Sequence, residues 1–516
     1  MKTILLFISI LFALSAQSQA DWSRIEKRDF ADGDFAFYQA DYSFACELFK
    51  PLHEKYSENQ RLNWIYAATL LYLKTNLQEA HQLLIRSSQS ETEALYHLGR
   101  SFHLRGEFES AMNAFTRYKI YEVRDFSDDD VDRQIAMCQA AKKLISSPVD
   151  VTIQNVGPAI NSENKEYVPL ITADGKTMYF TSRRKDSVAG LKDPNGEYYE
   201  DIYFSTLESG SWSTAKNVGL PINSETHDAT VTISADGNSM VIYRTNNNET
   251  GGDLYLCQLK STGWSKPKKF GERINSEFQE ASAALNQDGT IMIFSSNRPG
   301  GHGGKDLYRV KKLPNGEWSL PKNLGPNINT RFDEDAPFIS LDGKSLYFSS
   351  NGHQTMGGYD IFRSTILEAE IWSVPENLGY PINSVDDDIY LTLESNQRIG
   401  YYSSNQHDGF GQLDIYRLEF VDRQSTSMVV KGEVMDLQGR PIKAKITILD
   451  EDDKSIQGVY NTNSRTGKFI IIVHPQTVYK VFIEAEEYRT QQDEIYYVFP
   501  EKDELEFLMA PYILMK

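Results

Sequence analysis

Five acidic residues recur in the middle of the chain at a fixed distance from a repeated asparagine. The asparagines are residues 161, 223, 275, 329 and 383, and the acids five positions further on are Glu166, Asp228, Glu280, Glu334 and Asp388. Carboxylates that converge raise one another's pKa, or they recruit a cation or the basic groups of a partner. We therefore take these five acids as candidate binding residues. The alternatives are that each carboxylate accepts hydrogen bonds from backbone amides of its own loop, or that the five form a metal site; we expect neither a resident metal nor a cofactor.

The acids belong to a unit that occurs five times between residues 147 and 421. Each unit opens with Asn-x-Gly or a close variant, and the glycines are Gly157, Gly219, Gly271, Gly325 and Gly379. Asp-Gly pairs, typical of hairpin turns, follow at 174–175, 236–237, 288–289 and 342–343, whereas the fifth unit has Glu394-Ser395. Each unit then carries Asp-Ile/Leu-Tyr/Phe, at Asp201, Asp253, Asp306, Asp360 and Asp414. This period, with β-type residues, predicts propeller blades of four strands each.

The two ends of this array predict how it closes. The last unit has no outer strand with a tryptophan after Asp414, whereas an unpaired strand, Val151–Val156, precedes the first unit. We expect this strand to complete the fifth blade, because closure removes exposed sheet edges. The carboxylates would then form a ring at the start of the innermost strands, near one mouth of the channel.

The repeated turn and strand motifs together resemble the WD40-like repeat of TolB-related proteins, over roughly 275 residues. The resemblance implies a five-bladed β-propeller over residues 147–421.

Residues 22–146 show small residues and aromatics at helical spacing. Ala45, Ala80 and Ala111 are 35 and 31 residues apart, and a period near 34 indicates paired-helix repeats. Together with Leu98-Gly99 and Phe115, these residues resemble the tetratricopeptide pattern, and the first copy is degenerate before Asp41. The resemblance implies stacked helix pairs with a concave groove for a protein or peptide; the segment could equally be a docking spacer.

Residues 428–516 are strongly β in pattern. Asp436, Gly439 and Pro441 form an Asp-x-x-Gly-x-Pro turn, and Gly467-Lys468-Phe469 starts a later strand. These motifs resemble the carboxypeptidase regulatory-like domain, which implies a transthyretin-like β-sandwich. The fold class expected for the whole chain is thus multidomain, α plus all-β.

The first twenty residues combine Lys2, an apolar run from Ile4 to Leu14 and a small-residue end at Ala20, which is typical of a secretory signal peptide. No other segment has the apolar length of a transmembrane helix. A formal net charge of −19 argues against nucleic acid and anionic membranes as partners. The three cysteines, Cys46, Cys138 and Cys257, are too few for a disulfide framework.

This order of segments resembles envelope proteins of Bacteroidota, some of which carry an OmpA-like domain or are associated with type IX secretion. The resemblance implies an exported protein of the periplasm or outer membrane, whose partners are envelope or secretion-machinery proteins. Because the chain stops at Lys516 without an OmpA-like domain, we do not expect direct anchoring to peptidoglycan.

Two classes of function are compatible with these segments. No nucleophile–base pair, metal-ligand spacing or phosphate loop is visible, so the sequence predicts a non-enzymatic protein–protein interaction scaffold. The resemblance to envelope proteins implies that it is accessory to type IX secretion or outer-membrane organisation. The alternative is a five-bladed propeller that binds or hydrolyses glycans, which for hydrolysis requires two carboxylates in unlike environments.

Overall fold

The structure is a computed structural model that describes residues 22–516 except 194–195, 248–250, 342, 368–370, 407–408, 422, 424–426, 453 and 499–505. The predicted signal peptide, residues 1–20, lies outside the described residues. The contacts between residues divide the chain into two compact units. One is mainly helical, and the other, the β unit, comprises Leu144–Leu191 and Tyr198–Lys516. Within the described residues, we find no helix with both the length and the apolar character needed to cross a membrane.

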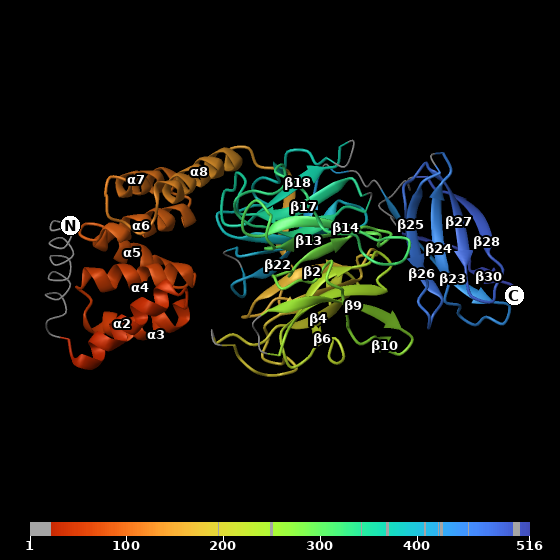
Figure 1. The fold of residues 1–516 in the computed structure, drawn as a ribbon, viewed down its shortest axis with the longest axis horizontal. Coiled ribbons are helices and arrows are strands. Elements are labelled where there is room, and N and C mark those ends of the chain that lie inside the picture. Colours follow the sequence, from red (N-terminus) through yellow and green to blue (C-terminus); the bar gives the residue numbers. More distant parts are fainter. Residues whose placement is uncertain are drawn as a thin grey trace. The chain divides into compact units, whose positions relative to one another are not determined.

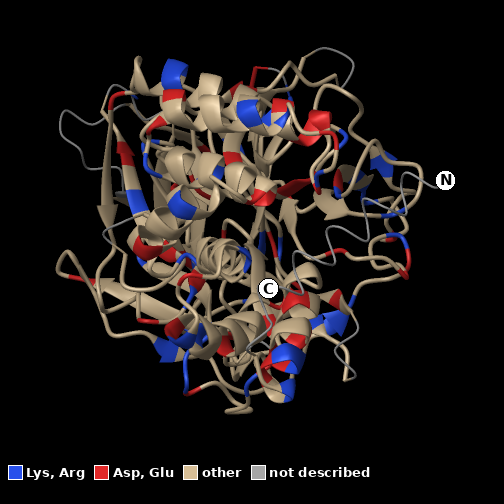
Figure 2. Ribbon diagram, turned by 90° about the vertical axis from the view of Figure 1, so that its left-hand side faces the viewer, with Lys and Arg blue, Asp and Glu red and all other residues tan. Residues whose placement is uncertain are grey.

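The helical unit consists of consecutive antiparallel helices (Figure 1). They are α2 (Arg24–Tyr38), α3 (Tyr42–Lys55), α4 (Gln60–Tyr72), α5 (Leu77–Ser87), α6 (Thr92–Leu104), α7 (Phe108–Tyr118) and α8 (Asp128–Ile145). α2 packs on α3, α4 on α5 and α6 on α7, which makes three hairpins. Acidic and basic positions are interspersed along these helices rather than gathered by sign (Figure 2).

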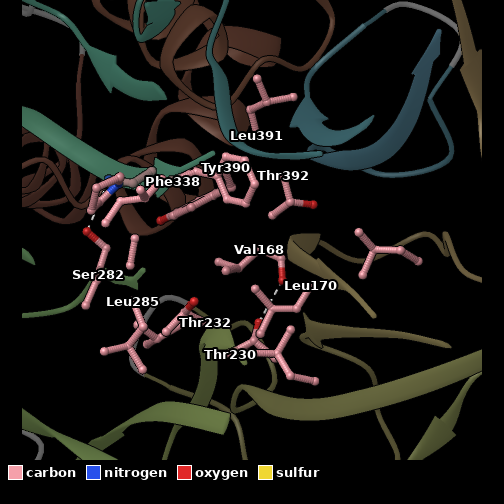
Figure 3. Close-up of a pocket in the computed structure, with 18 of the residues that line it drawn as sticks. Val168, Leu170, Thr230, Thr232, Ser282, Leu285, Phe338, Tyr390, Leu391 and Thr392 are labelled. Atoms are coloured by element: carbon pink, nitrogen blue, oxygen red, sulfur yellow. Dashed lines mark hydrogen bonds between the residues drawn. The ribbon is translucent and has the colours of Figure 1, made fainter. Parts of the chain in front are cut away.

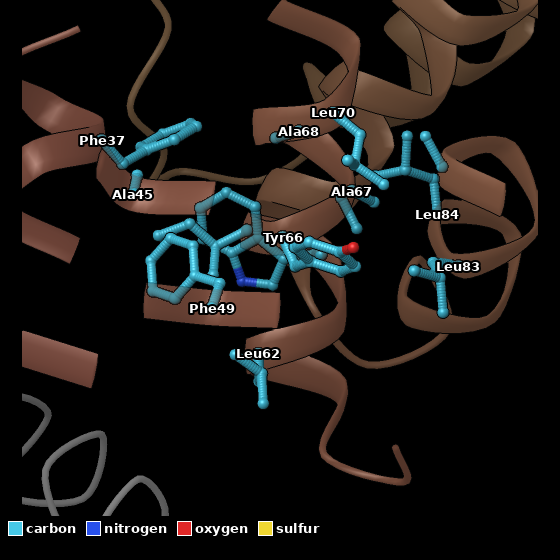
Figure 4. Close-up of a cluster of buried hydrophobic side chains, with 14 of the residues drawn as sticks. Phe37, Ala45, Phe49, Leu62, Tyr66, Ala67, Ala68, Leu70, Leu83 and Leu84 are labelled. Atoms are coloured by element: carbon cyan, nitrogen blue, oxygen red, sulfur yellow. The ribbon is translucent and has the colours of Figure 1, made fainter. Parts of the chain in front are cut away.

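Each hairpin is closed by a small residue facing a large one sixteen positions later. A Cβ atom added to Gly99 would lie 2.6 Å from the Phe115 ring, and one added to Gly33 would lie 2.7 Å from Phe49. Ala68 and Leu84, both fully buried, hold the same positions in the middle hairpin (Figure 4). The first copy, which looks degenerate in sequence, therefore packs like the third. The assignment to the tetratricopeptide family stays a prediction.

The β unit begins with five antiparallel sheets. The first contains β2 (Glu166–Ile171), β3 (Thr177–Ser182), β4 (Asp201–Glu208), β5 (Ser211–Trp212) and β6 (Lys216–Asn217). The second contains β7 (Asp228–Ile233), β8 (Ser239–Thr245), β9 (Gly252–Lys260), β10 (Gly263–Trp264) and β11 (Lys268–Lys269). The third contains β12 (Ala283–Leu285), β13 (Ile291–Ser296), β14 (Asp306–Lys311) and β15 (Lys322–Asn323). The fourth contains β16 (Glu334–Ile339), β17 (Ser345–Ser350), β18 (Asp360–Thr365) and β19 (Glu376–Asn377).

The fifth sheet joins the two ends of this region. It contains β20 (Asp388–Leu393), β21 (Ile399–Ser404), β22 (Asp414–Phe420) and β1 (Val151–Asn155), in the order β1-β22-β21-β20. β1 pairs with β22 from Val151–Phe420 to Asn155–Tyr416. The innermost strands contact one another in a circle, β2 with β7, β7 with β12, β12 with β16, β16 with β20 and β20 with β2. The region is a closed β-propeller, and the outermost strand of its fifth sheet, β1, comes from the start of the array, as the sequence predicts.

The turn of the fifth sheet differs from the sequence-based prediction. The Asp-Gly turns place Gly175, Gly237, Gly289 and Gly343 at φ of 66° to 68°. In the fifth sheet the residue in this conformation is Gln397, at φ 55°, so Asn396-Gln397, not Glu394-Ser395, replaces the Asp-Gly pair. The expected alignment was wrong by two residues, because no glycine marks this turn.

The remaining strands form two further sheets. They are β23 (Met428–Asp436), β24 (Lys445–Asp450), β25 (Ile456–Asn461), β26 (Lys468–Val473), β27 (Val478–Glu484), β28 (Gln491–Tyr496), β29 (Glu506–Leu508) and β30 (Tyr512–Leu514). β23 pairs with β26, β29 and β30 in one sheet, and the order in the other is β25-β24-β27-β28. A shared core that includes Val430, Ile446 and Tyr479 lies between them.

Closure by β1 predicts a specific loss of stability. Ile153 packs against the core between the fourth and fifth sheets, whereas its neighbour Thr152 is exposed. We expect Ile153→Ala to lower the free energy of unfolding by about 1–2 kcal/mol, since a half-buried side chain loses apolar contact, and Thr152→Ala to change it by less than about 0.5 kcal/mol. Chemical denaturation measures both. Equal effects would mean that β1 does not close the ring in solution.

Candidate functional site

The five acids singled out in the sequence are buried, and each begins or precedes the innermost strand of its sheet. Glu166, Asp228, Glu334 and Asp388 are the first residues of β2, β7, β16 and β20, and Glu280 lies three residues before β12. Each has at most 1% of its surface exposed. None of the five lines the central cavity described below.

Their carboxylates accept hydrogen bonds from the loop that precedes each strand. The backbone N–H and the hydroxyl of Ser162 donate to Glu166 at 2.6 and 2.8 Å, and Thr330 donates in the same way to Glu334 at 2.7 Å for both bonds. Ser224, Ser276 and Ser384 make the equivalent backbone bonds in the other sheets. This geometry matches the alternative of a loop-holding role, and a ligand-binding role of the five acids stays a prediction.

The five acids differ in their counter-charges. Arg184, Arg244 and Arg298 form ion pairs with Glu166, Asp228 and Glu280 at 3.2, 2.5 and 3.1 Å. Asp388 accepts hydrogen bonds from the Ser384 N–H and the Ser404 hydroxyl, and among the described residues it forms no ion pair. Burial raises the pKa of Asp388 well above its ordinary value, and the neighbouring Asp360 raises it further.

A cavity of about 300 Å³ lies at the centre of the propeller. Its walls come from the innermost strands of all five sheets, among them Val168 and Leu170, Thr230 and Thr232, Leu285, Phe338, and Leu391 and Thr392 (Figure 3). The volume is at the lower end of the range typical of small-molecule sites.

Three of these strands carry a bulge that turns a lining residue into the left-handed region. The pairing shifts after Tyr167, Asp335 and Ile389, and Val168, Ala336 and Tyr390 have φ of 50°, 50° and 64°. A β-branched residue such as Val168 rarely adopts this conformation. Such backbone costs about 1–3 kcal/mol per residue and is concentrated at functional sites, which makes this end of the cavity a candidate site.

One wall of this end is a buried ionic cluster around Glu200. Its carboxylate lies 3.2 Å from the Arg183 guanidinium and 3.2 Å from Nδ1 of His227, and it accepts a hydrogen bond from the Tyr167 hydroxyl. Burial alone would raise the pKa of Glu200, but the bonds to His227, Arg183 and Tyr167 lower it to about 2. Glu200 is therefore ionised at neutral pH.

A second cluster comes from the third and fourth sheets. The Lys305 ammonium lies 2.9 Å from Asp335, which also accepts hydrogen bonds from the Ser282 hydroxyl and from the Ala336 N–H. Burial opposes ionisation of Asp335, but the Lys305 charge and these bonds lower its pKa, and the charge of Asp335 raises the pKa of Lys305.

Tyrosine rings lie between the two clusters. The rings of Tyr167 and Tyr390 stack with centroids 6.2 Å apart, and Tyr243 lines the cavity beside them. Burial raises the pKa of Tyr390, and the charges of Asp335, Glu200 and Asp387 raise it further, so this ring lies within reach of both clusters. We call the end of the cavity formed by Tyr167, Tyr243, Tyr390 and Glu200 the tyrosine mouth. Asp335 does not line the cavity, but it is hydrogen-bonded to the lining residue Ser282.

The tyrosine mouth was missed in the sequence because its residues do not repeat from unit to unit. A signal was present for Tyr167, because it directly follows a repeated acid and lines the cavity, and adjacent residues of a strand face opposite sides. With the acid turned into its loop, the next residue turns toward the channel. Among the described residues there is no group of three or more His, Cys, Asp or Glu side chains arranged to hold a metal ion.

No family model matches the chain, and no curated protein matches it either. Solved structures do. They include the α-L-arabinofuranosidase PaAbf62A from Podospora anserina in complex with cellotriose (13% identity, TM-score 0.35, 53% of this chain and 97% of that chain). They also include an α-L-arabinanase from Penicillium chrysogenum with arabinobiose (10%, 0.31, 63% and 99%) and the WD40 repeats of RRP9 (9%, 0.30, 52% and 97%). Likeness at this level concerns the β-propeller fold and carries no conclusion about substrate or reaction.

These comparisons nevertheless correct the function expected from sequence. Two of the three structures named above, and two further similar structures, are arabinofuranosidases or arabinanases, which are enzymes that act on glycans. The prediction of a non-enzymatic interaction scaffold does not agree with them, and neither does the prediction that the chain is no enzyme.

The unequal counter-charges of the buried acids predict opposite effects of neutralising them. Because the pKa of Asp388 is raised above 3.8, its ionisation opposes folding, and its contribution to stability falls as the pH rises through the folded-state pKa. We expect Asp388→Asn to be at least as stable as the natural protein at pH 7, with an advantage that grows from about pH 4 upward.

Asp228→Asn is the matched comparison. Burial raises the pKa of Asp228 too, although the Arg244 charge opposes this shift. The two variants therefore differ in what they leave behind: Asp228→Asn leaves the Arg244 guanidinium without its carboxylate, and we expect a loss of about 3 kcal/mol. Urea denaturation of both variants between pH 4 and 8 measures the difference. Similar losses in the two variants would contradict the assigned charge states.

Proposed function

We propose that the propeller binds a carbohydrate at the tyrosine mouth. The observation that carries this proposal is the combination, on one 300 Å³ cavity, of the aromatic rings of Tyr167, Tyr243 and Tyr390 with the paired charges of Glu200. Sugars present apolar C–H faces that pack on aromatic rings, and hydroxyls that need hydrogen-bond partners. Both kinds of partner are present here.

The charge balance of the mouth supports an uncharged ligand. Glu200 is paired with Arg183, and Asp335 is paired with Lys305, so neither cluster offers an unpaired charge to an ionic ligand. The carboxylates can still accept hydrogen bonds from hydroxyls, since each oxygen has two acceptor sites.

Hydrolysis has a more specific requirement. A glycosidase needs one carboxyl that holds a proton and one that does not. Glu200 and Asp335 come from different sheets and lie near the same tyrosine, which supports a two-carboxylate arrangement, but the pKa of each is lowered. The geometry therefore supports recognition of a glycan more directly than its cleavage.

The other assignments made from sequence stay proposals. We propose that the chain is exported to the periplasm or outer membrane, and that envelope proteins are among its partners; the apolar run before Ala20 supports export. The three helix hairpins support the proposal of a tetratricopeptide-like array. The five sheets support a five-bladed WD40-like propeller, and the two C-terminal sheets support a carboxypeptidase regulatory-like sandwich.

Removal of a mouth tyrosine tests the binding proposal. Calorimetric titration with linear arabino-, xylo- and cello-oligosaccharides, beginning with arabinobiose and cellotriose, should identify a ligand. Tyr390→Ala should then weaken its binding at least about tenfold, which corresponds to about 1.4 kcal/mol. Tyr496→Ala, at an exposed tyrosine of β28, should leave the affinity unchanged. Absence of binding to every sugar at concentrations up to about 10 mM would overturn the proposal.

The same panel separates recognition from hydrolysis. Release of reducing sugar that Glu200→Gln and Asp335→Asn each lower by about a hundredfold or more would make the mouth an active site. Binding that persists without release would show that the mouth recognises the glycan and leaves it intact. Thermal unfolding of both variants controls for loss of fold.

A further inference from the structure

The end of the cavity opposite the tyrosine mouth is formed by the hairpin turns between the first and second strands of each sheet. Ala173, Ala235, Gln287, Leu341 and Ser395 belong to these turns, and all five line the cavity. The channel therefore extends as far as the turns. It is closed at that end only if another part of the chain covers the turns.

Four of the five turns bond to the C-terminal sheets. The Lys431 ammonium lies 3.0 Å from Asp174 in the first turn. In the second turn Asp236 accepts from the Asn461 N–H at 3.1 Å, and Asn238 donates to the Asn461 carbonyl at 2.9 Å.

The third and fifth turns are held in a similar way. Gln287 and the Tyr460 hydroxyl are hydrogen-bonded, and the amide orientation that satisfies both side-chain atoms of Gln287 also donates to the carbonyls of Leu341 and Gln457. The Ser427 hydroxyl donates to the Ser395 carbonyl. Gln287 and Ser395 thus line the cavity on one side and bond to the C-terminal segment on the other.

Part of this interface is buried, whereas the bonds between the second turn and Asn461 are exposed. Tyr460 is 1% exposed, and Ala235 of the second turn packs against the hydrophobic core of the C-terminal sheets. Burial alone would raise the pKa of Asp174, but its bonds to Thr172 and Lys431 lower it, so the ion pair with Lys431 is charged on both sides. A buried apolar contact flanked by paired polar groups is the arrangement of a stable interface.

We propose that the C-terminal sandwich is a built-in plug that closes the turn end of the channel, so that a ligand enters and leaves only through the tyrosine mouth. A cavity closed at one end admits the end of a chain and excludes threading. Combined with the carbohydrate-binding function proposed above, on which this part rests, the plug restricts the ligand to the terminal residues of a glycan.

Reactivity of a thiol placed under the plug tests the closure without any glycan. Ser395→Cys replaces a 5% exposed side chain by one of similar size, and mass spectrometry distinguishes its labelling by a bulky maleimide from that of Cys46, Cys138 and Cys257. In the otherwise natural full-length chain we expect slow labelling. Lys431→Glu combined with Asp236→Lys breaks two of the turn contacts, and it should accelerate labelling at residue 395 at least about tenfold.

The matched control is Lys516→Glu, because Lys516 forms an exposed ion pair with Glu487 of the C-terminal segment that includes no turn residue. It should leave the labelling rate as it was. Equal, rapid labelling in all three proteins would overturn the plug. Thermal unfolding shows whether the double variant keeps the propeller folded; if it unfolds, the single variant Lys431→Glu replaces it, with an expected acceleration of at least about threefold.

The glycan arm uses a linear oligosaccharide and a cyclic one of the same sugar. A plugged channel should bind the linear form at least about tenfold more tightly than the cyclic form, which has no terminus. Equal binding of the two would overturn the restriction to chain ends. Protection of residue 395 together with binding of no sugar would retain the plug and reject the carbohydrate function, so the two proposals fail separately.

Discussion

The propeller depends on a clamp in which one asparagine side chain bonds to the backbone of the preceding blade. Asn223 accepts from the Ile202 N–H and donates to the Ile202 carbonyl, both at 2.9 Å, and Asn161, Asn275, Asn329 and Asn383 bond in the same way to Ile415, Leu254, Leu307 and Ile361. A buried amide with both its oxygen and its nitrogen paired to backbone is fully satisfied, and removing it would leave two buried backbone groups without partners. Asn161 makes this bond across 254 residues, so the clamp also closes the ring.

The clamp explains why the acidic residues that attract attention in the sequence serve the fold. Each stands five residues beyond a clamping asparagine and accepts hydrogen bonds from the residue four positions before it, which fixes the loop between clamp and strand. A role required in every blade must recur in every blade, and a ligand site at the centre of a ring has no such requirement. Repetition is therefore evidence for a structural role, and the chemistry of the channel is to be sought among residues that do not repeat.

The sequence predicts the features that depend on repeated residues and misses those that depend on residues found in one blade only. The propeller, its period and the borrowed strand β1 follow from repeated residues, since each repeat supports the others. Gly33 and Phe49 have the same spacing as Gly99 and Phe115. They went unrecognised because the residues around them in the sequence differ from those around Gly99 and Phe115. Glu200 could not be placed, because it lies at the end of a long insertion in one blade and meets Arg183, His227 and Tyr167 only in the folded chain. The turn at Gln397 was misaligned because a non-glycine residue takes the left-handed conformation there.

The charge state of the tyrosine mouth limits what it can do. The pKa of Glu200 is lowered to about 2 and that of Asp335 is also lowered, so near neutral pH both carboxylates accept hydrogen bonds and neither donates a proton. Burial raises the pKa of Tyr243 to about 12 and that of Tyr390 as well, so these hydroxyls remain protonated and can donate. A mouth with ionised acceptors, neutral hydroxyl donors and aromatic faces is complementary to a ligand that has many hydroxyls and no charge. Cleavage would require a ligand that removes the contacts which lower these pKa values, chiefly the bond of His227 to Glu200 or the Lys305 charge beside Asp335. Burial would then raise the carboxyl pKa and favour a bound proton.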